Sequence, residues 1–211
     1  MRVLAIDTST ARLTVALLED DVLVREAQAG ELAGSQLHGE ALAGLVQQVL
    51  DGTTPDLVAV GLGPGPYTGL RVGIVTAEAL AFAWQVPVKG VPTLAALAHG
   101  YRSRGGGACV AVLDVKRREI AWQAFDADGG ELSAPAITHI ERLADLPQLP
   151  LVGPAFVSQR LVSPEVADAA PVSAVSIAHL ALQSPAGDLA PLYLRVPDAA
   201  EPAPRKRVGD V

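Results

Sequence analysis

The chain has 211 residues, of which 50% are hydrophobic, 18% charged and 4% aromatic. This composition excludes a disordered or low-complexity protein, and the length allows one large domain or two small ones. The formal net charge of −7 argues against tight binding of nucleic acid by this chain alone. No apolar run approaches the about 18 residues of a transmembrane helix and no leader pattern opens the chain, so we expect a cytoplasmic protein without membrane contact.

The first half predicts three antiparallel strands followed by alternating helices and strands. Short runs rich in β-branched residues are separated by turn-length gaps, and the spacing of apolar residues then changes to a helical period. The expected strands are 2–8, 12–18, 22–28, 56–62 and 86–91, and the expected helices are 36–50, 68–84 and 92–104. This order is typical of a mixed sheet with helices on its faces.

The second half repeats this order in outline after a break at Gly105–Gly107. The expected strands are 108–115, 119–125, 132–138 and 189–196, and helical pieces are expected near 155–161 and 173–184. The pattern predicts an α/β protein built from two related βββαβα modules. We expect an N-terminal lobe over 1–104, a smaller C-terminal lobe over 105–196 and a disordered tail over 197–211.

The segment GPGPYTGLRVG at 63–73 joins an expected strand to an expected helix, where α/β proteins often hold a phosphate. It lacks the lysine of a Walker loop and the glycine spacing of a dinucleotide loop, and Pro64 and Pro66 carry no N–H. We favour a stiff turn capped by Thr68. The alternative is a weak ligand loop formed by Asp7, Thr68, Gly69 and Arg71.

Asp7 ends the first expected strand and is followed by Thr8, Ser9 and Thr10. An aspartate at such a hairpin could act on the metal side of a nucleotide site. However, no glycine accompanies it, so close approach of the backbone to a phosphate is hindered. A turn whose hydroxyls satisfy local amides is the favoured interpretation.

The sequence offers no catalytic residue and no metal site. The four histidines, at positions 38, 99, 139 and 179, are too far apart to form a metal-binding pair on one helix. The single cysteine, Cys109, lies in an apolar run and reads as a core residue. We therefore predict no cofactor.

The helix after the glycine loop is apolar on nearly all sides, with Arg71, Thr76 and Glu78 as its only strongly polar residues over 70–84. A helix of this kind is covered on more than one side, either inside the monomer or at a subunit interface. We favour an interface shared with helix 36–50. The candidate contacts are Leu42, Leu45, Val46, Val49, Val75, Ala79 and Phe82.

The stretch GPGPYTGLRVGIVTAEALA resembles the GPGSFTGLRxGxxxAxxLA segment of the TsaB family, formerly called YeaZ. The segments LAIDTST, VLDVKRREIAWQAF and PLYLR are also similar to that family, so the resemblance runs from residue 1 to about 196. Pro66 stands where the family has serine, and Tyr67 where it has phenylalanine. The lost hydroxyl weakens any role of position 66 in binding a ligand.

The resemblance implies a two-lobed actin/Hsp70-like (ASKHA) fold with mixed sheets. It also implies a non-catalytic scaffold in the complex that makes N6-threonylcarbamoyladenosine (t6A) at position 37 of tRNA. The partners would be a TsaD-like catalytic subunit and a TsaE-like ATPase, with tRNA bound only through the complex and a homodimer formed by the chain alone. TsaD holds a metal with two histidines, and Thr93 and Leu97 stand in their places here.

Two other functions stay open from the sequence. An ASKHA-fold ATPase or small-molecule kinase would bind Mg-ATP through Asp7, the 8–10 hairpin and the glycine loop. Direct tRNA binding would use Arg205-Lys206-Arg207, although three basic residues in a tail are usually only solvated.

Overall fold

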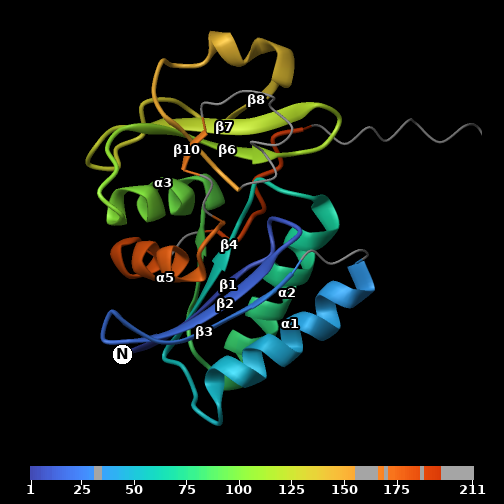
Figure 1. The fold of residues 1–211 in the computed structure, drawn as a ribbon. Helices are drawn as coiled ribbons and strands as arrows, with labels where there is room; N and C mark the ends of the chain where they lie inside the picture. The colour runs from blue at the N-terminus through green and yellow to red at the C-terminus, as the bar shows by residue number, and fades with distance from the viewer. Residues whose placement is uncertain (31–34, 155–165, 169–170, 186–187, 196–211) are drawn as a thin grey trace, which may run out of the picture.

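The computed structural model describes residues 1–30, 35–154, 166–168, 171–185 and 188–195. It contains two five-stranded mixed sheets with the same strand order (Figure 1). The first sheet has the order β3-β2-β1-β4-β5, and the second has β8-β7-β6-β9-β10. In each, the first strand in sequence lies at the centre, antiparallel to the second strand and parallel to the fourth. The duplicated, two-lobed ASKHA arrangement is therefore confirmed.

The strands of the first sheet follow the expected ranges closely because each is a short apolar run ended by a turn. They are β1 (Arg2–Asp7), β2 (Leu13–Glu19), β3 (Val22–Ala29), β4 (Leu57–Gly61) and β5 (Val88–Val91). The strands of the second sheet are β6 (Cys109–Asp114), β7 (Glu119–Phe125), β8 (Ala136–His139), β9 (Leu151–Val152) and β10 (Val166–Asp168).

The helices form layers on both sides of the sheets. They are α1 (Ser35–Leu50), α2 (Tyr67–Trp84), α3 (Thr93–Ser103) and α5 (Ala174–Gln183), with a 3-10 helix, η1, at Ile140–Asp145. Helices α1 and α2 cover one face of the first sheet, and α5 covers the other. Helix α3 lies between the sheets and packs mainly on the second, whose far face is covered by η1. Figure 1 shows these layers from the side, with α3 and α5 between the two sheets.

Helix α5 belongs to the second half of the sequence but completes the core of the first sheet. Ala174, Ile177, Ala178 and Ala181 are fully buried against apolar residues of β1, β2 and β4. The two halves of the chain are thus interleaved at their contact, because α3 from the first half packs on the second sheet. The predicted division at residue 104 stays a prediction.

Several local predictions need correction. The strand expected at 189–196 is absent from the described residues 188–195: Pro191 lacks an N–H, and Leu192 N instead donates to the loop carbonyl of Leu62 at 2.8 Å. Pro92 precedes α3 as its N-cap rather than forming its first helical residue.

The expected helix at 155–161 and the expected tail at 197–211 lie outside the described residues. No helix in the described part of the chain is long and apolar enough to cross a membrane.

Candidate functional site

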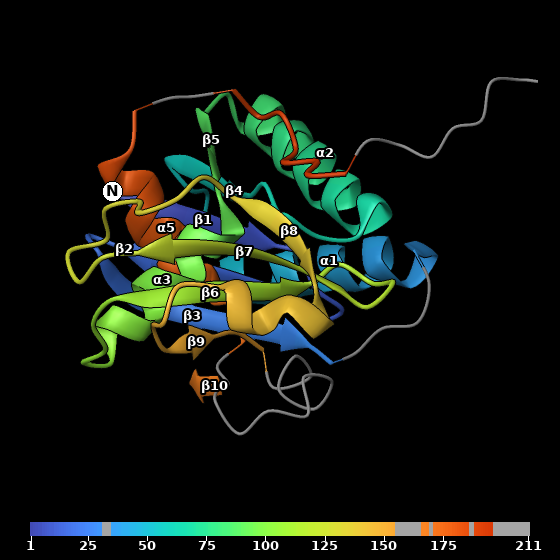
Figure 2. The ribbon, with the colours of Figure 1, turned by 90° about the horizontal axis from the view of Figure 1, so that it is seen from above.

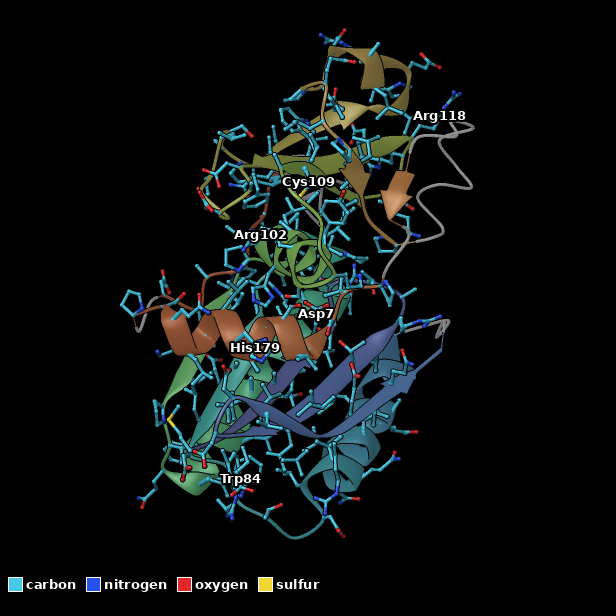
Figure 3. The ribbon with its side chains drawn as sticks, turned by 60° about the vertical axis from the view of Figure 1, so that its left-hand side comes forward. Asp7, Trp84, Arg102, Cys109, Arg118 and His179 are labelled. Carbon is cyan, nitrogen blue, oxygen red and sulfur yellow. The ribbon has the colours of Figure 1, made fainter. Side chains whose placement is uncertain are left out.

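The carboxylate of Asp7 is fully buried at the end of β1, beside the junction of the two lobes (Figure 3). Its Oδ1 accepts hydrogen bonds from the Ser9 backbone N at 2.9 Å and the Ser9 Oγ at 2.6 Å. Its Oδ2 accepts from the Thr93 Oγ1 at 3.0 Å. Burial raises the pKa of the Asp7 carboxyl. The three hydrogen bonds act in the opposite direction, but the pKa stays above its usual value. Asp7 is therefore held by neutral groups of the chain itself.

The glycine loop packs directly against the β1–β2 turn. A Cβ at Gly65 would lie 2.2 Å from the Ser9 carbonyl oxygen, and one at Gly69 would lie 2.7 Å from the Thr8 carbonyl oxygen. The Thr8 Oγ1 donates to the Gly69 carbonyl at 2.8 Å, and a Cβ at Gly73 would lie 2.2 Å from the same hydroxyl. These glycines let two segments of the chain approach each other, so the backbone of the glycine loop lies directly against the turn.

Thr93 closes the arrangement from the start of α3. Its Oγ1 accepts from Gly63 N at 3.1 Å, and its own N donates to the Gly63 carbonyl at 2.8 Å. A single hydroxyl is a poor ligand for zinc or iron, and Leu97, one turn further along α3, is a buried hydrocarbon. Over the described residues, no three His, Cys, Asp or Glu side chains gather as a metal site.

The start of α2 differs from the prediction. Its N-cap is Pro66 without a side-chain hydrogen bond, so Thr68 does not cap the helix and lies exposed on the surface. The Arg71 guanidinium stacks 3.9 Å from the centre of the Tyr67 ring, and its Nε donates to the Tyr193 Oη at 3.1 Å. The two tyrosine rings stack with their centroids 4.9 Å apart. Arg71 therefore holds two parts of the chain together.

Three predicted partner contacts on α1 are wrong. Leu42, Val46 and Val49 are buried in the core between α1 and the first sheet, and Leu45 is partly buried against the same core. The helical period that identified these residues marks the single apolar stripe of α1, and the sheet takes that stripe. They cannot reach a partner without unfolding.

The predicted contacts on α2 lie on the surface. Phe82 is 87% exposed and Val75 is 60% exposed, and Ala79 lies exposed between them. Their spacing of four and three residues places them on one stripe of the helix. The opposite side of α2 packs on the sheet through Ile74, Ala77 and Ala81. Helix α2 therefore has two apolar faces, one packed on the sheet and one exposed to solvent.

Known proteins match nearly the whole chain. The family described as TsaD, tRNA N6-adenosine threonylcarbamoyltransferase, matches residues 31–185. The tRNA threonylcarbamoyladenosine biosynthesis protein TsaB of Escherichia coli is 34% identical over 161 residues, covering 69% of this chain and 68% of its own length. The chain belongs to the TsaB (YeaZ) family. An uncharacterized protein of Mycobacterium tuberculosis is 33% identical over 204 residues, covering 93% of both chains.

A solved structure of a YeaZ protein has the same fold as this chain. YeaZ from Pseudomonas aeruginosa is 30% identical, with a TM-score of 0.69 over 87% of this chain and 92% of that chain. For this TsaB-family chain, sequence reasoning missed the roles of Thr93, Tyr67 and Tyr193. Tyr193 lies in the PLYLR segment that carried part of the resemblance, but its contact with α2 joins residues more than 120 positions apart.

Proposed function

We propose that this chain is a non-catalytic scaffold in t6A synthesis, where it binds and supports a TsaD-like catalytic subunit. The names of its TsaB relatives place those proteins in the synthesis of tRNA threonylcarbamoyladenosine. The observation that carries the scaffold role is the exposed stripe Val75, Ala79 and Phe82 on α2. In this proposal tRNA is contacted through the complex, a TsaE-like ATPase is a further partner, and the work is done in the cytoplasm.

The stripe has the chemistry of a helix-docking surface. Burying a phenylalanine or valine side chain stabilises a complex by about 1.5–3 kcal/mol, so an open Phe82 is a strong candidate anchor. Beside it, the outer side of α1 carries the exposed small residues Ala43 and Gly44, which allow a second helix pair to approach closely. Without a partner, the same surfaces of two copies would pair as a homodimer.

The alternative function as an ATPase or kinase has less support. Such an enzyme needs an aspartate and backbone amides open to Mg-ATP, whereas Asp7 is enclosed by Ser9 and Thr93. The glycine loop that would receive a phosphate contacts the turn residues Thr8 and Ser9 instead. Micromolar binding of Mg-ATP with turnover by the isolated chain, measured by calorimetry and phosphate release, would contradict the scaffold proposal.

The test is the substitution Phe82→Asp. A charge on the largest side chain of the docking stripe should weaken binding of the purified TsaD-like subunit by about 100-fold or more, measured by isothermal titration calorimetry. Phe82 has few contacts of its own, so the variant should keep the wild-type circular dichroism spectrum and Tm. Leu132→Asp is the matched control, because Leu132 is also an exposed apolar residue, 58% exposed, outside both helices.

Wild-type affinity in Phe82→Asp would reject the α2 surface. Equal weakening by Leu132→Asp would show that the effect comes from added charge rather than from the stripe. The proposal requires that Phe82→Asp loses affinity for the TsaD-like subunit and that Leu132→Asp keeps it.

A further inference from the structure

A cavity of about 450 Å³ opens beside the first turn of α2. Its walls come from three segments that are distant in sequence: the glycine loop at 64–67, the turn after β6 at Val115 and Lys116, and the last described segment at 192–195. Ile137 of β8 adds to the wall from the second sheet. The walls are mostly apolar, and the volume is in the range of cavities that hold a small molecule or a few side chains.

The walls are held in place by contacts between segments that are distant in sequence. Tyr193 stacks on Tyr67 and is bonded by Arg71, which fixes the last segment to α2. Two residues further on, Arg195 forms an ion pair with Glu119 of β7. Figure 2 shows this last segment running alongside α2. The cavity is therefore formed before any occupant arrives, which lowers the entropy lost on binding.

The charged side chains that line the cavity are basic in a chain whose net charge is −7, and Arg195 among them is already paired with Glu119. Lys116 and Arg195 both line it, and Arg71 lies beside it on Tyr67. The Lys116 side chain is 63% exposed, and its Nζ lies 3.8 Å from Asp114, at the outer limit of an ion pair. An acidic group could therefore approach Lys116 without displacing a close partner.

The cavity and the exposed stripe fall within the footprint of one interface. Tyr67 is the first residue of α2, is 49% exposed and lines the cavity. Because an α-helix rises about 1.5 Å per residue, Tyr67 and Phe82 are separated by about 22 Å along α2. A standard interface buries about 800 Å² on each partner, which corresponds to a patch about 30 Å across.

We propose that this cavity receives an apolar side chain that adjoins an acidic residue, both from the TsaD-like subunit that docks on α2. The inference rests on the proposed function and adds a second, specific contact to it. The apolar side chain fills the space between the glycine loop and the turn after β6, and the acidic residue pairs with Lys116. In this proposal the stripe on α2 contributes most of the buried apolar surface of the interface. The cavity fixes the position of the partner along the helix.

Two variants test the cavity. Val115→Trp fills it from the turn after β6, and Lys116→Glu reverses the charge at its rim. Each should weaken binding of the TsaD-like subunit by about 10-fold to 30-fold in calorimetry. The matched controls are Leu132→Trp and Arg142→Glu, which change an exposed apolar residue and a 72% exposed arginine outside the cavity. Both controls should bind as the wild type does.

Phe82→Asp measured in parallel separates this inference from the proposed function. If both cavity variants bind normally and Phe82→Asp does not, the cavity inference is wrong and the docking proposal stands. If all three bind normally, the proposed function is wrong as well. Weakened self-association with unchanged affinity for the TsaD-like subunit would assign the cavity to a second copy and overturn the inference. Since Lys116 is on the surface, Lys116→Glu decides the matter even if Val115→Trp does not fold.

Discussion

The ends of β1 and β6 carry the same local motif in two different environments. Asp7 ends β1 and Asp114 ends β6, and these strands are the centres of sheets with the same strand order. Each aspartate accepts a hydrogen bond from the backbone N–H two residues later, at 2.9 Å from Ser9 and 2.8 Å from Lys116. Both are Asx-type turns that start a hairpin.

The two turns differ in what approaches them. The turn after Asp7 is buried under the glycine loop, whereas the turn after Asp114 is exposed and forms one wall of the cavity. Lys116, Arg117 and Arg118 all have left-handed backbones there, with φ of 69°, 56° and 59°. The duplicated fold thus provides two equivalent turns, of which the first is used for internal packing and the second remains accessible.

The contact between the glycine loop and the first turn gives the largest predicted effect on stability. In Gly65→Ala the new Cβ meets the Ser9 carbonyl oxygen at 2.2 Å, and both partners are backbone that cannot move aside easily. We expect a loss of about 3 kcal/mol in the free energy of unfolding, measured by urea denaturation.

The control for this variant is Gly44→Ala. Gly44 lies in α1 with nothing within 4 Å of an added Cβ. Alanine there should stabilise the protein by about 0.5–1 kcal/mol, because glycine is a poor helix former. Equal stability of Gly65→Ala and the wild type would mean that the glycine loop does not press on the first turn.

The buried carboxylate predicts a pH effect that is specific to the first turn. Burial raises the pKa of Asp7 in the folded state, so folding favours its protonated form. Its contribution to stability is therefore complete below the unfolded pKa of about 3.9 and is lost as the pH rises through the folded pKa. Asp7→Asn removes the buried charge, although its NH2 group cannot accept the hydrogen bond of the Thr93 hydroxyl, so its gain over the wild type should be largest at pH 8 and at most about 1 kcal/mol.

Denaturation of both proteins between pH 4 and pH 8 measures this difference. It should shrink as the pH falls toward the unfolded pKa of an aspartate, because the buried carboxyl of the folded wild type takes up a proton more readily than the unfolded one. Asp128→Asn, at an exposed aspartate, is the control for the same chemical change made outside the core. A difference that stays constant with pH would show that the charge of Asp7 is not what distinguishes the two proteins.

The sequence was sufficient for the elements whose pattern is local. The β-branched runs and the change to helical period predicted the first five strands and the helices α1, α2 and α3 with ends displaced by at most a few residues. The strand expected at 189–196 failed because alternating leucines look the same whether they pair with a strand or lie on a loop. Its backbone contact is with Leu62, more than 100 residues earlier.

The site was only partly predictable because its main contacts are long-range. The sequence shows which residues are glycine, but it does not show that the Ser9 backbone approaches Gly65 or that Thr93 reaches Asp7. Periodicity likewise identified the apolar stripe of α1 without showing that the sheet covers it. Helix α2 was the better candidate because a helix apolar on nearly all sides retains an open apolar face after the core has taken one.

The smallest predicted change in stability concerns the turn after Asp114. Lys116 has a φ of 69°, which is unfavourable for a side chain with a Cβ and unrestricted for glycine. Lys116→Gly should therefore stabilise the protein by about 0.5 kcal/mol, since relief of the left-handed strain slightly exceeds the extra entropy of glycine in the unfolded state. The unfolding midpoint in urea measures this change in stability.

The same variant lacks the cation at the cavity rim, so it should bind the TsaD-like subunit more weakly while being more stable. A variant that gains stability and keeps full affinity would show that the Lys116 cation does not contribute to partner binding, against the cavity inference.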